Sequence, residues 1–232
     1  MMTLFGHPLN TASHWTFFVS ILPLIFKGLI ITVEATILGF LVALGLGLIF
    51  ALLRRVPVRA VSWPTVFVIE FVRDTPLLVQ LYFLYFVLPV YGVRMPAFIT
   101  GLLALGIQYS AYTSEVYRAG LDAVDRGQWE ASKALNLSTV RTYRDVVIPQ
   151  AIPRVIPAMG NYLVSMIKDT PVLSAVTVLE MLSMAQMIGD RVFRYFVPLT
   201  TVGLFFLIVT LFASALVRFL ERVLPKQGIP LK

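Results

Sequence analysis

The sequence predicts an all-helical protein that crosses a membrane several times. Of its 232 residues, 58% are hydrophobic and only 13% are charged, whereas soluble domains carry about 25% charged residues. Apolar stretches long enough to cross a lipid core, about 20 residues each, recur along the whole chain. The short alternating segments of a membrane barrel do not occur, so helices must satisfy the backbone within the lipid.

The apolar stretches divide a single transmembrane domain, residues 1–232, into five expected spans. They cover about 21–53, 61–90, 97–117, 155–188 and 196–220. The first corresponds to roughly 50 Å of helix, which exceeds the ~30 Å hydrocarbon core, so it must tilt or protrude. A polar loop of about residues 118–154 separates the third span from the fourth.

Basic residues predict the orientation of these spans. Thirteen lie in segments that would share one side of the membrane, against three on the other. The thirteen are Arg54, Arg55, Arg59, Arg118, Arg126, Lys133, Arg141, Arg144, Arg154, Arg218, Arg222, Lys226 and Lys232, and the three are Arg94, Arg191 and Arg194. Because cytoplasmic loops collect Lys and Arg, we expect a bacterial inner-membrane protein with its N-terminus outside and its C-terminus cytoplasmic. The net charge of +7 therefore reflects topology, and no nucleic-acid partner is expected.

Several kinds of chemistry are not expected of this sequence. It has no cysteine, which excludes disulfides and thiolate metal sites, and its two histidines form no cluster that would hold a metal. Gly101 and Gly106 have the spacing of a phosphate-binding loop, but Ile107 and Gln108 follow instead of Lys and Ser. We therefore expect no catalytic residue, no metal site and no ATP hydrolysis on this chain.

The 118–154 loop predicts two helices joined by a sharp turn. Residues 128–135 are good helix formers with no Gly or Pro. Asn136 is suited to the left-handed conformation that ends a helix. Ser138 can cap a second helix over about 139–148, which Pro149 would end.

An apolar stripe on the first of these helices consists of Trp129, Ala131, Ala134 and Leu135. Nothing in the chain's own cytoplasmic segments is expected to be large enough to bury it. The stripe could dock on a soluble partner, or it could lie on the membrane surface as an amphipathic helix. Physical chemistry alone leaves both interpretations open.

The loop resembles the EAA motif of the permease subunits of ABC importers. Glu130-Ala131-Ser132 matches the start of that motif, Asn136 stands where the family carries Gly, and Ile148-Pro149-Gln150-Ala151 matches its end. The substitution of Asn for Gly keeps the left-handed turn available. The resemblance implies that this loop couples to an ATPase subunit through Gln128, Trp129, Glu130, Ala131, Ser132, Leu135 and Asn136.

Three further segments resemble permeases for polar amino acids. They are Arg73-Asp-Thr-Pro-Leu-Leu-Val-Gln80, Ala111-Tyr-Thr-Ser-Glu-Val-Tyr-Arg118 and Lys168-Asp-Thr-Pro-Val-Leu-Ser174, in the family's order. The resemblance, over about residues 70–190, implies the type I importer fold with five helices. It also implies a second, related permease, two ATPase subunits that hold ATP and Mg²⁺, and an extracytoplasmic solute-binding protein, with no cofactor on this chain. Thr170-Pro171-Val172 more narrowly resembles permeases for ectoine-type compatible solutes.

Few charges fall within the expected spans, and each costs ~2.5–3.5 kcal/mol near the bilayer centre unless it has a partner or a wet cavity. One pattern occurs twice: a cation, an anion, a threonine and then a helix-breaking proline. It is found in Arg73-Asp74-Thr75-Pro76 and in Lys168-Asp169-Thr170-Pro171. Each proline should free a backbone carbonyl, that of Val72 or Ile167, toward a cavity. The candidate pathway residues are Arg73, Asp74, Gln80, Lys168, Asp169 and Glu180.

The same charges could instead form a salt-bridged network that holds the second and fourth spans together. Ala43, Gly45 and Gly47 in the first span predict a close helix–helix approach. The function expected overall is the permease subunit of an importer for a small polar solute, an amino acid or an ectoine-like compound. An autonomous secondary transporter or channel is the alternative, and a membrane enzyme is disfavoured because no nucleophile–base pair occurs in the spans.

Overall fold

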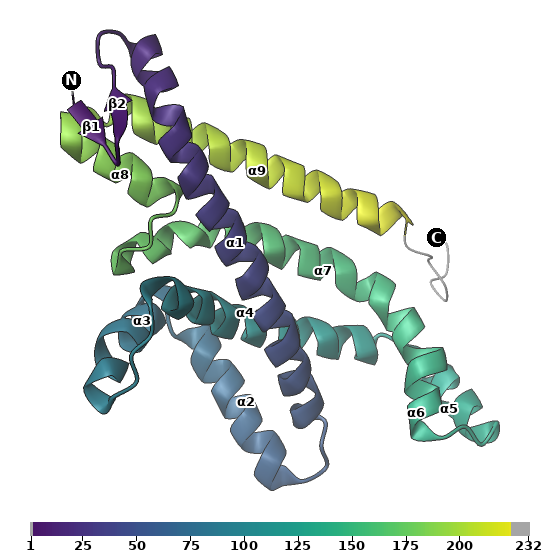
Figure 1. The fold of residues 1–232 in the computed structure, drawn as a ribbon. Coiled ribbons are helices and arrows are strands. Elements are labelled where there is room, and N and C mark those ends of the chain that lie inside the picture. The colour runs from purple at the N-terminus through teal and green to yellow at the C-terminus, as the bar shows by residue number, and fades with distance from the viewer. Residues whose placement is uncertain (1, 224–232) are drawn as a thin grey trace.

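A computed structural model describes residues 2–223, which are almost entirely helical (Figure 1). Lys226 and Lys232 of the charge argument lie outside the described residues. The elements are β1 (Met2–Leu4), β2 (His7–Leu9), α1 (His14–Arg54), α2 (Arg59–Asp74), α3 (Leu77–Tyr82), α4 (Ala97–Asp122), α5 (Arg126–Ala134), α6 (Thr139–Arg141), α7 (Ile148–Asp169), α8 (Met181–Val192) and α9 (Phe196–Val223). Short π-helical or 3₁₀ segments lie at Phe83–Val87, Leu88–Tyr91, Thr142–Val147 and Thr170–Val176.

The second and fourth expected spans are each broken into two helices, next to the prolines that the sequence marks as helix-breaking. Within the described residues, α1 and α9 are each long and apolar enough to cross a membrane, and two bent pairs raise the number to four. The α2–α3 pair bends by 104° and the α7–α8 pair by 48°. α4 has 26 residues, but polar residues interrupt its apolar sequence. The count of five spans and the orientation of the termini stay predictions.

The first break follows from the sequence at Thr75-Pro76. A residue before proline is driven out of the helical region, and Thr75 is extended with ψ 127°. The side-chain amide of Gln80 then donates to the carbonyl oxygens of Val72 at 2.8 Å and Thr75 at 3.0 Å. The expectation that the Val72 carbonyl is unpaired was therefore wrong, because a neighbouring side chain satisfies it.

The backbone carbonyl at the second break also finds a hydrogen-bond donor nearby. The hydroxyl of Thr170 donates to the carbonyl oxygen of Ile167 at 2.7 Å, and the backbone N–H of Thr170 also reaches that carbonyl. The Ile167 carbonyl is therefore paired, contrary to expectation. Both corrections follow from one rule: a buried backbone acceptor costs free energy unless it finds a donor.

The centre of the fold is the close packing of α1 against α4. Gly39, Ala43 and Gly47 follow one another at four-residue intervals on the buried face of α1. A Cβ on Gly47 would lie 2.1 Å from Thr113 Oγ1 and 2.9 Å from the Ser110 carbonyl oxygen. The Thr113 hydroxyl donates across the interface to the Ala43 carbonyl at 2.8 Å. Small residues thus let the two backbones touch, as in packed membrane helices.

The expected close-approach set was partly wrong. Gly45 is exposed, and nothing lies within 4 Å of the position its Cβ would take. Gly39, which the sequence analysis did not include, faces Leu105 and Met166 instead. Helical periodicity explains the difference, because residues two positions apart point about 200° away from each other.

The two N-terminal strands form a hairpin that the all-helical prediction did not include. Phe5 (φ 48°) and Gly6 (φ 78°) both have positive φ, as a two-residue mirror-image turn requires. The hairpin lies against α8 (Figure 1), and Leu9 joins the apolar core formed with Phe17 and Ile188. Among residues 2–223, the departure from the all-helical prediction is confined to this short terminal segment.

We predict that Gly47→Ala destabilises the protein, whereas Gly45→Ala does not. The new methyl group at residue 47 would meet backbone atoms of α4, and overpacking of this kind costs about 1–3 kcal/mol. At residue 45 the same change is free of contacts and gains helix propensity of up to ~1 kcal/mol. Thermal unfolding of the detergent-purified protein measures both, and equal midpoints for the two variants would contradict the packing argument.

Candidate coupling loop and transport pathway

The left-handed turn predicted at Asn136 is confirmed. Asn136 has φ 51°, immediately after α5. Its backbone N–H donates to the Lys133 carbonyl at 2.9 Å, and the Leu137 N–H donates to the Ser132 carbonyl at 3.0 Å. These two bonds define the Schellman motif, which satisfies the last carbonyls of a helix through a left-handed residue. The first helix of the loop therefore ends in a compact turn.

Trp129 packs on its own chain, and the expectation that it lacks such a partner was wrong. Its ring meets Tyr143 edge to face, with 5.3 Å between ring centroids. Both rings lie against a small buried cluster of Val124, Val147 and Ala151. Ser132 is also buried, and its hydroxyl donates to the Gln128 carbonyl at 2.7 Å. Trp129 and Ser132 thus support α5 from within.

The remaining candidate coupling residues are exposed on the loop, which projects from one end of the molecule (Figure 1). They are Gln128, Glu130, Ala131, Leu135 and Asn136. Leu135 is 74% exposed. Val140, which sequence reasoning missed, is also 74% exposed and lies just beyond the turn. We call these two exposed side chains, Leu135 and Val140, the apolar tip of the loop.

The second helix of the loop does not end at Pro149, contrary to expectation. Ser138 caps it as predicted, accepting from the Arg141 N–H at 3.4 Å. The chain then passes through the π-helical segment Thr142–Val147 directly into α7, where Pro149 occupies the first turn. Pro149 lacks a backbone N–H, so the helical chain continues past it without a hydrogen bond from that residue. The loop is therefore continuous with a membrane helix.

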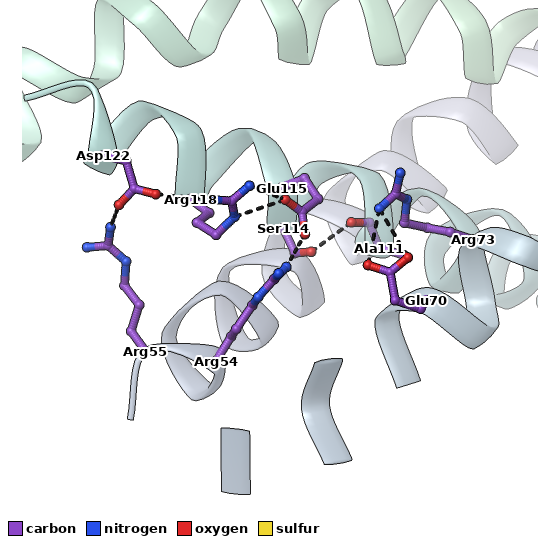
Figure 2. A network of polar contacts seen from close by, with 9 residues as sticks. All are labelled: Arg54, Arg55, Glu70, Arg73, Ala111, Ser114, Glu115, Arg118 and Asp122. Carbon is purple, nitrogen blue, oxygen red and sulfur yellow. Dashed lines mark hydrogen bonds and ion pairs between the residues drawn. The ribbon is translucent and has the colours of Figure 1, made fainter. Parts of the chain in front are cut away.

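The first predicted charge pair lies near α4. Arg73 is exposed and pairs with Glu70 of its own helix at 3.4 Å (Figure 2). Its guanidinium carbon also lies 5.9 Å from the centre of the Tyr112 ring, within the range of a cation–π contact. Asp74 is exposed beside it.

The second predicted charge pair divides between two environments. Asp169 accepts a hydrogen bond from the Tyr109 hydroxyl at 2.7 Å. Lys168 is exposed, and its side chain has no hydrogen bond or ion pair with any of residues 2–223. No ion pair in this part of the chain joins the two charge motifs, so the alternative of a direct salt-bridged network between them is not what the structure shows. Each motif instead contacts a tyrosine of α4.

Three tyrosines that sequence reasoning missed lie between the charge motifs. Tyr112 stacks on Tyr162 of α7 with centroids 5.4 Å apart. Tyr109 meets both edge-on, at 5.9 Å and 6.2 Å. Their signal was available in the sequence, because residues 109 and 112 share one face of α4. The cluster places aromatic faces and hydroxyls beside Arg73 and Asp169.

Gln80 and Glu180 have structural roles. Besides its backbone contacts, the Gln80 amide donates to Gln108, which in turn donates to the Tyr112 hydroxyl at 3.1 Å. Glu180 is fully buried, and its two carboxylate oxygens accept from the N–H groups of Ser183 at 2.6 Å and Leu182 at 2.8 Å. Glu180 therefore caps α8, and its expected place on the pathway is corrected.

One face of α7 combines polar side chains with exposure. Asn161 and Lys168 are exposed and Ser165 is partly exposed, and the spacing of four and three residues places them in one row. Polar side chains in membrane helices face a bundle interior or a water-filled cavity. Together with Tyr112 and Tyr162, this row forms what we call the α4–α7 polar face.

Comparison with known proteins identifies the family. A sequence profile described as a binding-protein-dependent transport system inner membrane component matches residues 43–224. The chain belongs to this family. It is a permease subunit of an ABC importer and a multi-pass protein of the inner membrane.

Individual relatives agree with this assignment. A protein of Sinorhizobium fredii described as a "probable amino-acid ABC transporter permease" is 58% identical over 99% of this chain and 100% of its own length. An L-cystine transport permease of Bacillus subtilis is 36% identical over 79% of each chain. The crystal structure of an amino acid ABC transporter with histidines aligns with a TM-score of 0.85 and 35% identity, covering 92% of this chain and 99% of that one. The permease fold is the type I fold that the sequence predicts.

We predict that Asn136→Val loosens the coupling turn, whereas Asn136→Gly preserves it. A non-glycine residue at positive φ costs about 1–2 kcal/mol, and Val lacks the local hydrogen bonding that helps Asn. Such a cost increases local opening about 5–30-fold. Limited proteolysis of the purified protein measures opening of the loop, and equal cleavage rates for the Val and Gly variants would contradict a left-handed turn.

Proposed function

We propose that this chain and a second, related permease subunit enclose the pathway of a zwitterionic solute, an amino acid or an ectoine-like compound. An extracytoplasmic binding protein would deliver the solute, and two ATPase subunits holding ATP and Mg²⁺ would drive its passage. The observation that carries the proposal is the α4–α7 polar face, which the isolated chain leaves uncovered. The amino-acid transporters among the relatives support the choice of solute.

The polar face is incompatible with lipid contact. Most other exposed side chains of the long helices are apolar, for example Leu41 of α1 and Phe212 of α9, with Lys27 and Glu34 of α1 as exposed charges. A face with Asn161 and an exposed Lys168 would cost several kcal/mol against hydrocarbon. Water and a second permease subunit would cover it at no such cost. This requirement supports a paired permease with the pathway between its two members.

The side chains at this level suit a solute with both charges. Lys168 and Arg73 offer cations to a carboxylate, whereas Asp74 and Asp169 offer anions to an ammonium group. The rings of Tyr112 and Tyr162 can add cation–π attraction. Tyr109 holds Asp169 in place through its hydroxyl, which orients the carboxylate before the solute arrives.

Five spans remain the topology best supported by the charge distribution, with α4 as the third. Its 26 residues would extend about 39 Å, enough to cross the hydrocarbon core. Its polar residues do not disqualify it, because Gln108, Ser110 and Thr113 are buried within the protein. The distribution of Lys and Arg then supports an outside N-terminus and a cytoplasmic C-terminus.

The exposed part of the coupling loop is proposed to contact an ATPase subunit. The contact would be formed by Glu130, Ala131, Leu135 and Asn136, with Gln128 at its edge and Val140 added to the apolar tip. Trp129 and Ser132 would serve it indirectly, by holding α5 on the chain. Because the loop runs into α7 without a break, movement of the ATPase would reach the polar face. An autonomous transporter or channel, the alternative, would need no such loop, and co-purification with an ATPase distinguishes the two.

We predict that Lys168→Met impairs transport in the complete transporter. Loss of a charged hydrogen-bond donor costs ~1.5–3 kcal/mol, or about 10–100-fold in solute binding. Uptake of radiolabelled glutamine, arginine, histidine, cystine and ectoine into proteoliposomes identifies the solute, and its concentration dependence then measures the loss. Lys27→Met is the matched control, since Lys27 lies in α1 within 3.2 Å of His7 and away from the polar face. Equal effects of both variants would remove Lys168 from the pathway.

We predict that Glu130→Arg abolishes ATP-driven uptake while the protein still reaches the membrane. The change reverses a charge at the proposed contact without disturbing the buried side of α5, because Glu130 is exposed. Glu221→Arg makes the same charge change in the last turns of α9 and should preserve uptake. Co-purification of the ATPase separates lost docking from lost coupling, and normal uptake by the Glu130 variant would rule out this role.

A further inference from the structure

We propose that the pathway contains a second solute site at its cytoplasmic end, in a cavity of about 390 Å³ between α4 and α7. This inference rests on the proposed function. The cavity is lined by Glu115, Arg118, Arg154, Val116, Ala119 and Ala158, among others. Its volume lies within the ~300–1,000 Å³ typical of small-molecule pockets. The ligand is a small solute that carries both a carboxylate and an ammonium group.

The cavity lies on the same face as the proposed pathway. On α4, Val116 and Ala119 follow Tyr112 at intervals of four and three residues, which places all three in one row. On α7, Ala158 precedes Tyr162 by four residues and belongs to the same row as the tyrosine. The α4–α7 polar face therefore continues into the cavity, and a solute that leaves the tyrosine cluster toward the cytoplasm meets Arg118 and Arg154.

Arg118 is held in place by neighbouring carboxylates. Its Nε and Nη2 donate to Glu115 Oε2 at 2.9 Å and 2.8 Å, and its Nη1 donates to Asp122 Oδ2 at 3.2 Å (Figure 2). These contacts fix the guanidinium plane beside the cavity. A fixed guanidinium binds a carboxylate with little further loss of side-chain freedom.

The charge of the cavity is positive in spite of these carboxylates. Arg54 pairs with Glu115, and Arg55 pairs with Asp122, both from the end of α1 (Figure 2). Three guanidinium groups, of Arg54, Arg55 and Arg118, therefore share two carboxylates, and the group keeps one net positive charge. Arg154 adds a further cation, and its Nη1 donates to the backbone carbonyl of Ala123. A focused positive field attracts the carboxylate end of a zwitterion.

Small residues form the remainder of the site. Gly120 is buried, and a Cβ there would lie 2.2 Å from a methyl group of Val155, so α4 and α7 approach closely just behind the cavity. Ala119, Ala123 and Ala158 leave the space open in front. The walls are therefore apolar and shallow, with the charged groups at one side, which suits a weakly held solute that is about to leave.

An anionic lipid headgroup shares the chemistry of the solute carboxylate, and basic pockets at the cytoplasmic side of membrane helices do bind such headgroups. The position of this cavity favours the free solute. A lipid would need an apolar surface for its acyl chains, and the adjoining face carries Asn161, Ser165 and Lys168 instead. The experiment below separates the two sources.

The natural absence of cysteine permits a direct test. Ala119→Cys places a single thiol at the cavity, and Ile152→Cys, an exposed position of α7 outside the cavity lining, is the control. In the complete transporter in inverted vesicles, a membrane-impermeant maleimide is added with or without glutamine, arginine, histidine, cystine or ectoine. At about ten times its dissociation constant, the bound solute should slow labelling at residue 119 about tenfold, following 1 + [L]/Kd. Labelling at residue 152 should not change.

Two further results are expected if the solute binds in this cavity. Adding Arg154→Gln should shift the protecting concentration upward about tenfold or more, since a charged hydrogen bond is lost. Protection should also be equal in vesicles of phosphatidylcholine and of phosphatidylglycerol. Protection by phosphatidylglycerol alone assigns the cavity to a lipid and overturns the proposal.

The inference and the proposed function fail in different ways. If the wild-type transporter takes up one of the probes but that probe does not protect residue 119, the second site is absent and the main pathway stands. If no probe is taken up, the proposed function itself fails. Should Ala119→Cys not assemble, Ala158→Cys tests the same cavity from α7, and absence of protection there overturns the proposal equally.

Discussion

The close contact between α1 and α4 is the constraint on which the rest of the structure depends. In lipid, helices gain little by burying apolar surface against each other, so they associate through close packing and hydrogen bonds. The interface uses both, with Gly47 against α4 and the Thr113 hydroxyl on the Ala43 carbonyl. At the C-terminal end of α1 it continues as the ion pair between Arg54 and Glu115. The two helices therefore form a scaffold that can hold the polar side of α4 in register.

The coupling loop and the charged residues Lys168 and Asp169 are connected to this scaffold through α7. On one side α7 begins as the second half of the coupling loop, and on the other it ends at Lys168 and Asp169. Pro153 and Pro157 lie between, within the helix, where each removes a backbone hydrogen bond and permits bending. A force on the loop can therefore change the angle between the two ends of α7 without separating α4 from α1. This arrangement connects the proposed ATPase contact with the proposed solute face.

The sequence predicted the chemistry of turns better than the contacts of individual side chains. Asn136 was predictable because its left-handed conformation depends on local backbone energetics alone. The packing contacts of Trp129 were not predictable, because Tyr143 and the cluster around it come together only when α7 folds back. Pro76 and Pro171 predicted where two helices break, whereas Pro149 did not end its helix. The sequence did not reveal that Gln80 and Thr170 would satisfy the freed carbonyls. Glu180 was expected to be a functional charge, because the sequence alone does not reveal that it caps the start of a helix.

The residue at the coupling turn also bears on how the loop would recognise the proposed ATPase partner. A glycine at position 136 would give the free loop access to a wide range of backbone conformations, which would be lost on docking. Asn136 restricts that range before the partner arrives, while its side chain still permits φ 51°. Less conformational entropy is then lost when the complex forms, so a smaller contact suffices for the same affinity. In the proposed complex, the turn would present a preorganised contact surface to the ATPase.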